Sequence, residues 1–181
     1  MVAESGNLQA EPWTALVAQA RAGDEAAFTR IVARYHPDLL RIAAVVAGDV
    51  DVAAEAAQAA WVVAWRRLHD LREPGNLRPW LMSIAANEAR QLIRSRGRRT
   101  LREVAVLDPA APAADAGVAS RIDLANALAT LEPRDRELLG LRYLAGLDSS
   151  EIARAAGMSP TAVRTRLARA RERLRQELGD D

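Results

Sequence analysis

Apolar residues recur at intervals of three and four along most of the chain, and the strict alternation typical of strands is missing. This spacing predicts an all-α protein. A first helix is expected over residues 12–22, where Gly23 ends it, and Asp24 is a good cap for a second helix. Pro37 is expected to break or restart this second helix, after which the apolar spacing continues to Gly48.

The next two helices are also marked by their ends. An alanine-rich helix is expected over residues 49–71, and the Pro-Gly pair in REPGN, residues 72–76, ends it. Asn76 is a good cap for the following helix, which tolerates Pro79 in its first turn. Gly97 is expected to weaken the end of that helix.

Residues 104–117 (VAVLDPAAPAADAG) are rich in alanine, proline and aspartate and lack helical spacing, which is typical of a linker. We therefore expect two small helical domains joined by a flexible linker. The predicted parts are an N-terminal extension over residues 1–11, a first domain over 12–99, the linker over 100–119 and a second domain over 120–178. The second domain is expected to begin with a helix over residues 120–131, followed by a helix opened by Pro133.

A helix-turn-helix is predicted near the C-terminus. Asp148, followed three residues later by Glu151, is similar to a capping box. Gly157 can adopt a positive φ and turn the chain, and Ser159 caps the next helix with Pro160 at its first position. Two helices joined by a short turn that contains glycine form this motif.

The last helix divides into two faces when its residues are placed at intervals of about 100°. Its apolar stripe, which must pack on the preceding helices, consists of Val163, Leu167, Ala170 and Leu174. The opposite face carries short side chains bordered by arginines, which suits entry into a DNA major groove. The candidate contacts are Ser159, Thr161, Arg164, Thr165, Arg166, Ala168 and Arg169. The alternative is a solvated amphipathic helix at the end of a bundle.

Charge is unevenly distributed in a chain of formal net charge +1. Six arginines lie within residues 90–102, which hold no acidic residue, and six more lie within residues 164–175, where Glu172 is the single acid. Two basic clusters in a nearly neutral chain indicate two local contacts with a polyanion.

Composition excludes several classes of protein. The chain has no cysteine, so disulfides and thiolate metal sites are excluded, and its two histidines are too few and too scattered to indicate a metal site. Carboxylates stand mostly at helix starts or on polar faces, and no phosphate loop or nucleophile elbow is present, so we expect no catalytic residue and no cofactor. The N-terminus lacks the features of a secretory signal, and no apolar run is long enough to span a membrane, so we expect a soluble cytoplasmic protein.

Residues 131–174 resemble the C-terminal promoter-reading domain of extracytoplasmic-function sigma factors. The resemblance rests on the sequence LEPRDRELLGLRYLAGLDSSEIARAAGMSPTAVRTRLARARERL, in which RLARAR, residues 166–171, matches the terminal element of the family pattern. Asp148 stands where serine is common in the family, and Ala162 stands where threonine is common. The helix-turn-helix by itself would fit a two-component response regulator equally well.

The N-terminal half decides between these two families. Residues 80–99 (WLMSIAANEARQLIRSRGRR) resemble the N-terminal domain of the sigma factors, and residues 54–68 (AEAAQAAWVVAWRRL) resemble their polymerase-binding helix. The motifs occur in the order of the family, with the linker in the expected place. The resemblance covers about residues 25–175.

This resemblance implies that the first domain opens the promoter −10 element. The loop over residues 71–78 and the helix after it would hold an unstacked base and the single strand beside it, by stacking, amide hydrogen bonds and arginine–phosphate contacts. The candidate residues are Asn76, Trp80, Asn87, Arg90 and Arg94. For Trp80 the favoured interpretation is a core anchor.

The resemblance also implies that the helix over residues 49–68 docks on the coiled-coil clamp of core RNA polymerase. Its exposed face is expected to carry Glu55, Gln58 and Val62, and its core positions are expected to be Trp61, Ala64, Trp65 and Leu68. The family normally has a glutamate after the glutamine, where this chain has Ala59. That difference implies a weakened or differently tuned polymerase contact.

We therefore expect a sigma factor that recruits core RNA polymerase to promoter DNA, with the last helix recognising the −35 element. An anti-sigma factor is a further candidate partner, and no membrane contact is expected. The first alternative is a helix-turn-helix regulator that binds DNA without polymerase. The second is an all-α adaptor that binds only protein.

Overall fold

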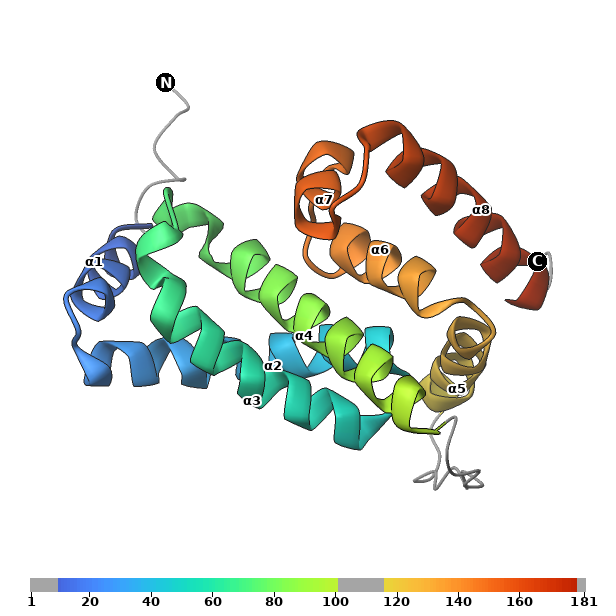
Figure 1. Ribbon diagram of the computed structural model, residues 1–181, viewed down its shortest axis with the longest axis horizontal. Helices are drawn as coiled ribbons and strands as arrows, with labels where there is room; N and C mark the ends of the chain where they lie inside the picture. The colour runs from blue at the N-terminus through green and yellow to red at the C-terminus, as the bar shows by residue number, and fades with distance from the viewer. Residues whose placement is uncertain (1–9, 101–115, 179–181) are drawn as a thin grey trace.

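The computed structural model describes residues 10–100 and 116–178, and within these ranges the chain is helical without strands (Figure 1). The prediction of an all-α protein is confirmed. The N-terminal unit consists of α1 (Ala10–Arg21), α2 (Glu25–Ala47), α3 (Val50–Arg67), the 3₁₀ turns η1 (Leu68–Asp70) and η2 (Pro74–Asn76), and α4 (Leu77–Thr100). The C-terminal unit consists of α5 (Ala116–Ala129), α6 (Pro133–Tyr143), α7 (Ser149–Ala156) and α8 (Pro160–Leu178).

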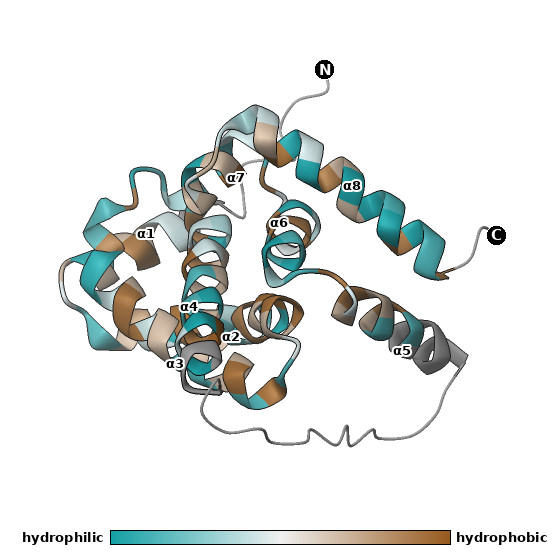
Figure 2. Cartoon of the chain, turned by 45° about the vertical axis from the view of Figure 1, so that its right-hand side comes forward, coloured by the Kyte–Doolittle hydropathy of each residue, from teal (hydrophilic) through white to brown (hydrophobic). Residues whose placement is uncertain are grey.

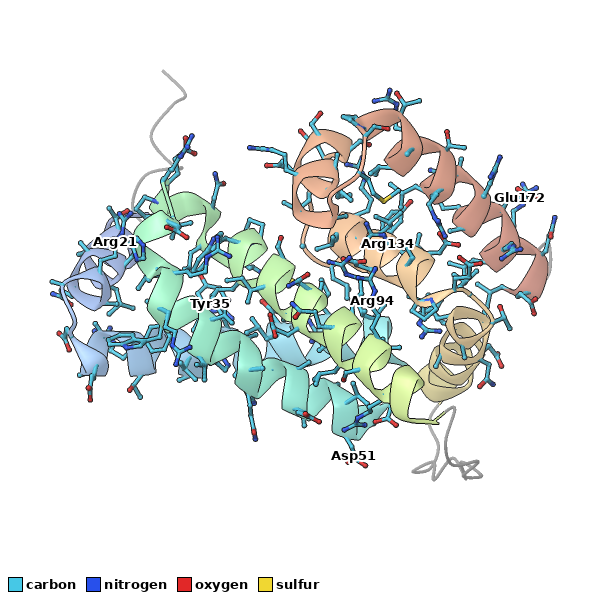
Figure 3. All side chains as sticks on the ribbon, viewed as in Figure 1. Arg21, Tyr35, Asp51, Arg94, Arg134 and Glu172 are labelled. Carbon is cyan, nitrogen blue, oxygen red and sulfur yellow. The ribbon has the colours of Figure 1, made fainter. Side chains whose placement is uncertain are left out.

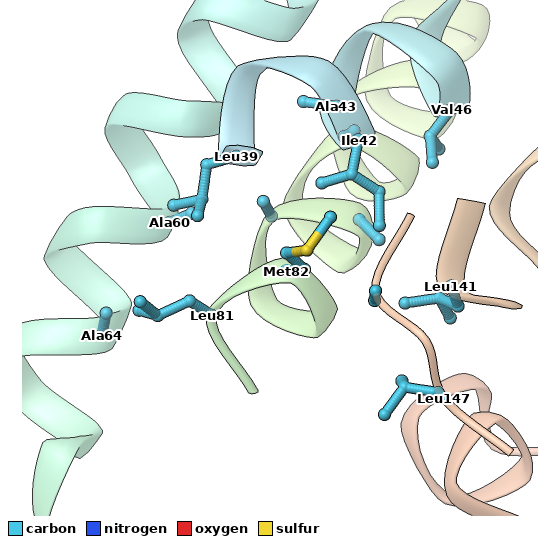
Figure 4. Close-up of a cluster of buried hydrophobic side chains, with 14 of the residues drawn as sticks. Leu39, Ile42, Ala43, Val46, Ala60, Ala64, Leu81, Met82, Leu141 and Leu147 are labelled. Atoms are coloured by element: carbon cyan, nitrogen blue, oxygen red, sulfur yellow. The ribbon is translucent and has the colours of Figure 1, made fainter. Parts of the chain in front are cut away.

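The core of the N-terminal unit lies between α2, α3 and α4, which pack on one another. Leu39 and Ile42 of α2 and Leu81 and Met82 of α4 are fully buried there (Figure 4). The α3 helix contributes mainly alanines to this core, namely Ala53, Ala56, Ala57, Ala60 and Ala64. Because alanine side chains are small, α3 can approach its neighbours closely, and its alanine-rich composition is explained by packing.

The α2 helix begins as predicted but does not break at Pro37. The Asp24 carboxylate accepts hydrogen bonds from the backbone N–H groups of Ala26 and Ala27, which confirms the cap. The helix continues through Pro37, so the predicted break is wrong. Burial of Leu39 and Val46 beyond the proline outweighs its cost of about 3 kcal/mol, because each large apolar side chain contributes about 1.5–3 kcal/mol when buried.

The junction between α3 and α4 also differs from the prediction. The α3 helix ends at Arg67 and is followed by the 3₁₀ turn η1, although the helix was expected to reach residue 71. Asn76 directly precedes α4, but its amide donates to the Glu73 carboxylate and is engaged within the turn. The α4 helix continues through Gly97 to Thr100, so the expected weakening there is not seen in the backbone.

The C-terminal unit confirms the predicted local signals. Asp148 accepts from the backbone N–H groups of Ser150 and Glu151, and the Glu151 carboxylate accepts from the backbone N–H of Asp148, which completes a capping box. Gly157 ends α7 with a φ of 63°, and α8 begins at Pro160. The α5 helix begins at Ala116, so residues 116–119 of the expected linker are helical. Residues 101–115 of that linker lie outside the described residues.

The α6 helix joins the two units, because it packs on α2 and α4 as well as on α7 and α8. Arg136 of α6 is buried, and its guanidinium donates to the carbonyls of Val46 and Ala47 at the end of α2. It also donates to the carbonyl of Leu131 in its own unit. Gly140 faces Ile42 so closely that a Cβ there would lie 3.3 Å from Ile42 Cγ1.

Candidate DNA and polymerase interfaces

The α8 helix has the two faces that its sequence predicts. Val163, Leu167 and Ala170 are buried against the other helices of the C-terminal unit. Of the predicted DNA contacts, Thr161, Thr165, Ala168 and Arg169 are exposed along the opposite face, with Arg164 and Ser159 near the start of the helix. Hydrophilic residues make up much of this helix, with hydrophobic residues at intervals between them (Figure 2). The predicted separation of apolar and outward faces is confirmed.

The first turn of α8 is ordered by its own side chains. The Ser159 hydroxyl accepts from the backbone N–H of Ala162 at 3.2 Å, which confirms the predicted cap. Arg164 donates to the Thr161 hydroxyl at 3.1 Å, and the Thr165 hydroxyl donates to the Thr161 carbonyl at 3.0 Å. The helix therefore presents small hydroxyl-bearing residues and an arginine on one exposed turn.

Arg166 lies apart from the outward face. Its guanidinium donates to the Asp135 and Glu132 carboxylates, each at 2.7 Å, so it ties α8 to the start of α6. The hydrogen bond that the Arg166 guanidinium donates to Asp135 raises the pKa of Arg166, and its hydrogen bond to Glu132 adds to this effect, despite the opposing contribution of burial. The structure therefore separates Arg166 from the other predicted contacts with DNA.

The predicted −10 residues of the loop and the first turns of α4 line one groove of about 870 Å³. Asn76, Trp80 and Asn87 form part of its wall, together with Ser83. Trp80 and Asn87 are half-buried, and Trp80 also packs against the core, as the core-anchor interpretation requires. The facing wall belongs to the C-terminal unit and includes Leu147, Glu151, Arg154 and Ala155.

Arg90 is engaged at the boundary between the units. Its guanidinium donates to the Asn87 side chain, and its Nε lies 3.4 Å from a carboxylate oxygen of Glu137 in α6. Glu137 is only 1% exposed, and its other oxygen lies 2.7 Å from Arg134, which also donates to the carbonyl of Ala156. Arg94 remains exposed on α4, close to the same junction as Arg134 (Figure 3).

Burial dominates the electrostatics of this boundary. Desolvation raises the pKa of the Glu137 carboxyl, although the nearby Arg134, Arg90 and Arg94 act in the opposite direction. Desolvation likewise lowers the pKa of Arg90, against the attraction of Glu137. A charged pair in such a place contributes little net stability, since its attraction must first offset the cost of removing both groups from water.

The candidate polymerase surface on α3 is larger than predicted. Glu55, Gln58 and Val62 are exposed, as expected, and Glu55 pairs with Arg96 of α4 at 2.7 Å. Trp65 continues the same stripe at a spacing of three residues and is 38% exposed, so its predicted core position is only partly correct. Its inner edge contacts Phe28, with ring centroids 4.7 Å apart. The spacing 55, 58, 62 and 65 in the sequence is the signal that identifies it.

The described residues support neither a metal site nor a membrane-spanning helix. In residues 10–100 and 116–178, side chains of histidine, aspartate and glutamate form no cluster suited to a metal ion. Among the helices in these ranges, none is both long and apolar enough to cross a membrane.

Family models match both halves of the chain. A model described as Sigma-70 region 2 matches residues 31–99, and a model described as Sigma-70, region 4 matches residues 121–174. The RNA polymerase sigma factor NccH of Alcaligenes xylosoxydans is 34% identical over 88% of this chain and 91% of its own length. The ECF RNA polymerase sigma factor SigM of Mycobacterium tuberculosis is 31% identical over 91% of this chain and 83% of its own length. The chain belongs to the extracytoplasmic-function sigma factors of the sigma-70 family.

This sigma factor is also similar to a longer relative and to two sigma factors of solved structure. The probable RNA polymerase sigma factor RfaY of Xanthomonas campestris is 37% identical, and this chain spans 42% of its length. The sigma factor RpoE, solved with the anti-sigma factor NepR from Bartonella quintana, is similar over 85% of this chain and 98% of its own, with a TM-score of 0.73 and 27% identity. CnrH, solved with the cytosolic domain of CnrY, covers 90% of this chain and 94% of its own, with a TM-score of 0.62 and 30% identity.

Proposed function

We propose that this sigma factor directs core RNA polymerase to a restricted set of promoters. In this proposal α8 recognises the −35 element as a duplex, and α4 with its preceding loop holds the opened −10 element. The observation that carries the proposal is the outward face of α8, where exposed Thr161, Thr165, Ala168 and Arg169 lie opposite the buried stripe. Small side chains permit close approach to a major groove, and flanking arginines supply contacts to guanine or phosphate.

Two of the arginines are well placed to contact DNA. Arg164 lies on the first exposed turn of α8, and Arg169 is exposed further along the helix, on the other flank of the outward face. Each bidentate contact with a guanine would contribute about 1–3 kcal/mol of discrimination. Arg166 is held by Asp135 and Glu132, and its proposed role is to orient α8 on α6.

The groove beside α4 suits a single-stranded ligand. Asn76 and Asn87 offer amide groups for an extruded base, and Trp80 presents an aromatic surface between them in sequence. Stacking of one base on an aromatic side chain contributes about 1–3 kcal/mol. Exposed Arg94 would hold a phosphate nearby. Arg90 would contribute in the same way once it is released from Glu137.

The exposed stripe of α3 is the proposed polymerase contact. Glu55, Gln58 and Val62 present polar and apolar groups together, and Trp65 adds a large aromatic surface to them. Aromatic residues that bury their surface at an interface often dominate its binding energy. We assign no catalytic activity to the chain itself, and we propose that it works in the cytoplasm, where polymerase and promoter DNA meet.

The arrangement of the two units has a consequence for promoter opening. Helix α7 contributes the facing wall of the groove, and Glu137 forms an ion pair with Arg90. The proposed −10 surface on α4 is therefore partly covered. Opening a promoter would therefore require the units to separate, and binding to polymerase would supply the free energy for this step. By analogy with RpoE, which was solved in complex with the anti-sigma factor NepR, we propose an anti-sigma protein as a partner that holds the units together.

A gel-shift experiment with and without core polymerase tests the proposal. Promoter DNA should shift only when polymerase and the chain are both present, and permanganate should then detect unpaired thymines in the −10 element. A specific shift by the chain alone would instead identify a helix-turn-helix regulator. If no DNA crosslink forms in either condition, the chain is a protein-binding adaptor.

A further inference from the structure

The loop between α3 and α4 is fixed at both ends but exposed in the middle. Leu71 and Leu77 are 3% and 2% exposed, and they anchor the two ends of the loop in the core. Arg72, Glu73 and Asn76 between them are exposed. Asn76 belongs to the groove that also contains Trp80 and Asn87, so the position of the loop determines the position of one wall of that groove.

Hydrogen bonds within this loop are local. The Leu71 N–H donates to the carbonyl of Leu68, and Asn76 donates to Glu73 from both its backbone and its side chain. Such bonds shape a turn, but they do not tie it to the rest of the protein. Long-range contacts are needed to hold the turn in one orientation.

Arg21, at the end of α1, supplies contacts of this kind. Its guanidinium donates to the carbonyl of His69 at 3.0 Å and to the carbonyl of Leu71, which are 48 and 50 positions away in sequence. These carbonyls lie at the C-terminal end of η1, where backbone oxygens lack partners within the turn and carry partial negative charge. An arginine is well suited to them because one guanidinium can donate to both.

Helix α1 holds Arg21 in place. Leu16 and Val17 are buried against the rest of the N-terminal unit, and α1 packs on both η1 and η2. The helix lies before residues 31–99, which match the region 2 family model. The contact therefore joins a segment outside the matched region to the loop at the groove.

We propose that Arg21 is a positioning residue of the −10 site. It holds the backbone of the α3–α4 loop so that Asn76 stands in the groove with Trp80 and Asn87 before single-stranded DNA arrives. This inference rests on the proposed role of that groove. Preorganisation of the loop lowers the entropy cost of ordering it around an extruded nucleotide.

The experiment compares Arg21→Met with Arg30→Met, which removes an exposed arginine from α2. In the full-length chain, Arg21→Met should speed exchange of the Leu71 and Asn76 amides, which are hydrogen-bonded within the turn, on the order of tenfold, because the turn loses its two hydrogen bonds to α1. With core polymerase, the same variant should bind the promoter but give a weaker permanganate signal at the −10 thymines. Arg21→Lys, which retains the charge and a donor, should recover part of both effects, and Arg30→Met should match the wild type in both assays.

Two results would overturn the inference. One is loop exchange in Arg21→Met equal to that in Arg30→Met, and the other is faster exchange with a normal permanganate signal. Thermal melting of Arg21→Met shows whether the variant is simply unfolded. A positioning role predicts faster loop exchange and weaker promoter opening at temperatures far below its melting transition. Asn87→Ala tests the groove itself: a normal signal from that variant, together with faster loop exchange in Arg21→Met, would refute the −10 assignment while leaving the tie between α1 and the loop intact.

Discussion

Glu137 is an acid buried between the two units, with Arg134 and Arg90 beside it. Burial raises the pKa of this carboxyl above its ordinary value. When the units separate, the carboxyl returns to water and its pKa falls toward that ordinary value. The closed arrangement therefore binds the proton more tightly than the separated units do.

The sign of the pH dependence follows from this difference. The contribution of Glu137 to closure is fully present below the ordinary carboxyl pKa and is lost as the pH rises through the raised pKa. The charged groups that act on it are Arg134, Arg90 and Arg94. Small-angle scattering over a pH series that starts near the ordinary carboxyl pKa should show a more compact chain at the acidic end. Glu137→Gln should remove this dependence, and identical pH profiles for the variant and the wild type would contradict the role of Glu137.

Arg164 and Arg169 should behave differently from Arg166. Alanine at either of the first two should leave thermal melting unchanged and weaken promoter binding by the holoenzyme, by about 1–3 kcal/mol for a bidentate base contact. A phosphate contact should instead weaken binding on every sequence and reduce the salt slope by about one. Arg166→Ala should lower the melting temperature, because it removes the ties to Asp135 and Glu132. Normal melting and normal binding for both Arg164→Ala and Arg169→Ala would identify α8 as a solvated face.

Substitutions on α3 should change the affinity for core polymerase in both directions. Ala59→Glu introduces the glutamate common in the family and should tighten binding to core polymerase. Trp65→Ala should weaken it by about tenfold or more, because an exposed aromatic residue on the stripe is lost. Val50→Ala is the control, since Val50 is 80% exposed on α3 but lies off the stripe. Fluorescence anisotropy with core polymerase measures all three, and equal affinities would place the polymerase contact elsewhere.

Caps and turns of the helices were predictable because each depends on residues a few positions apart. Asp24, Asp148 and Gly157 are examples, and all three were correct. Pro37 and Trp65 were not predictable in the same way. The continuation of α2 depends on the burial of its later residues against α3, α4 and α6, and the exposure of Trp65 depends on how closely α3 lies against Phe28.

In the candidate sites, too, features set by neighbouring positions were predictable and features set by tertiary packing were not. The outward face of α8 follows from helical spacing within one element, so the sequence was sufficient to find it. The acidic partners of Arg166 stand more than thirty positions earlier, and Glu137 stands 47 positions after Arg90 (137 − 90). Pairing over such distances depends on tertiary packing, which helical periodicity does not report.

Contact between the units depends on the missing side chain of Gly140. Leucine at this position should favour the α6 helix itself, since leucine has a higher helix propensity than glycine by nearly 1 kcal/mol. Its side chain would overlap Ile42, because even a Cβ would lie 3.3 Å from Ile42 Cγ1. Gly140→Leu should therefore expand the chain in small-angle scattering while circular dichroism retains its helical signal. A compact variant would show that the interface can repack around the added side chain.

Arg136 connects two distant parts of the sequence, and this bears on the order of folding. Its hydrogen bonds to the carbonyls of Val46 and Ala47 span 90 and 89 positions. Contacts of such separation form slowly because a long chain segment must first be closed, whereas the helices and their neighbouring pairs form from local contacts. We expect α2, α3 and α4 to assemble early and α6 to dock on them last. During synthesis, the carbonyl groups at the end of α2 would lack this partner until α6 had left the ribosome.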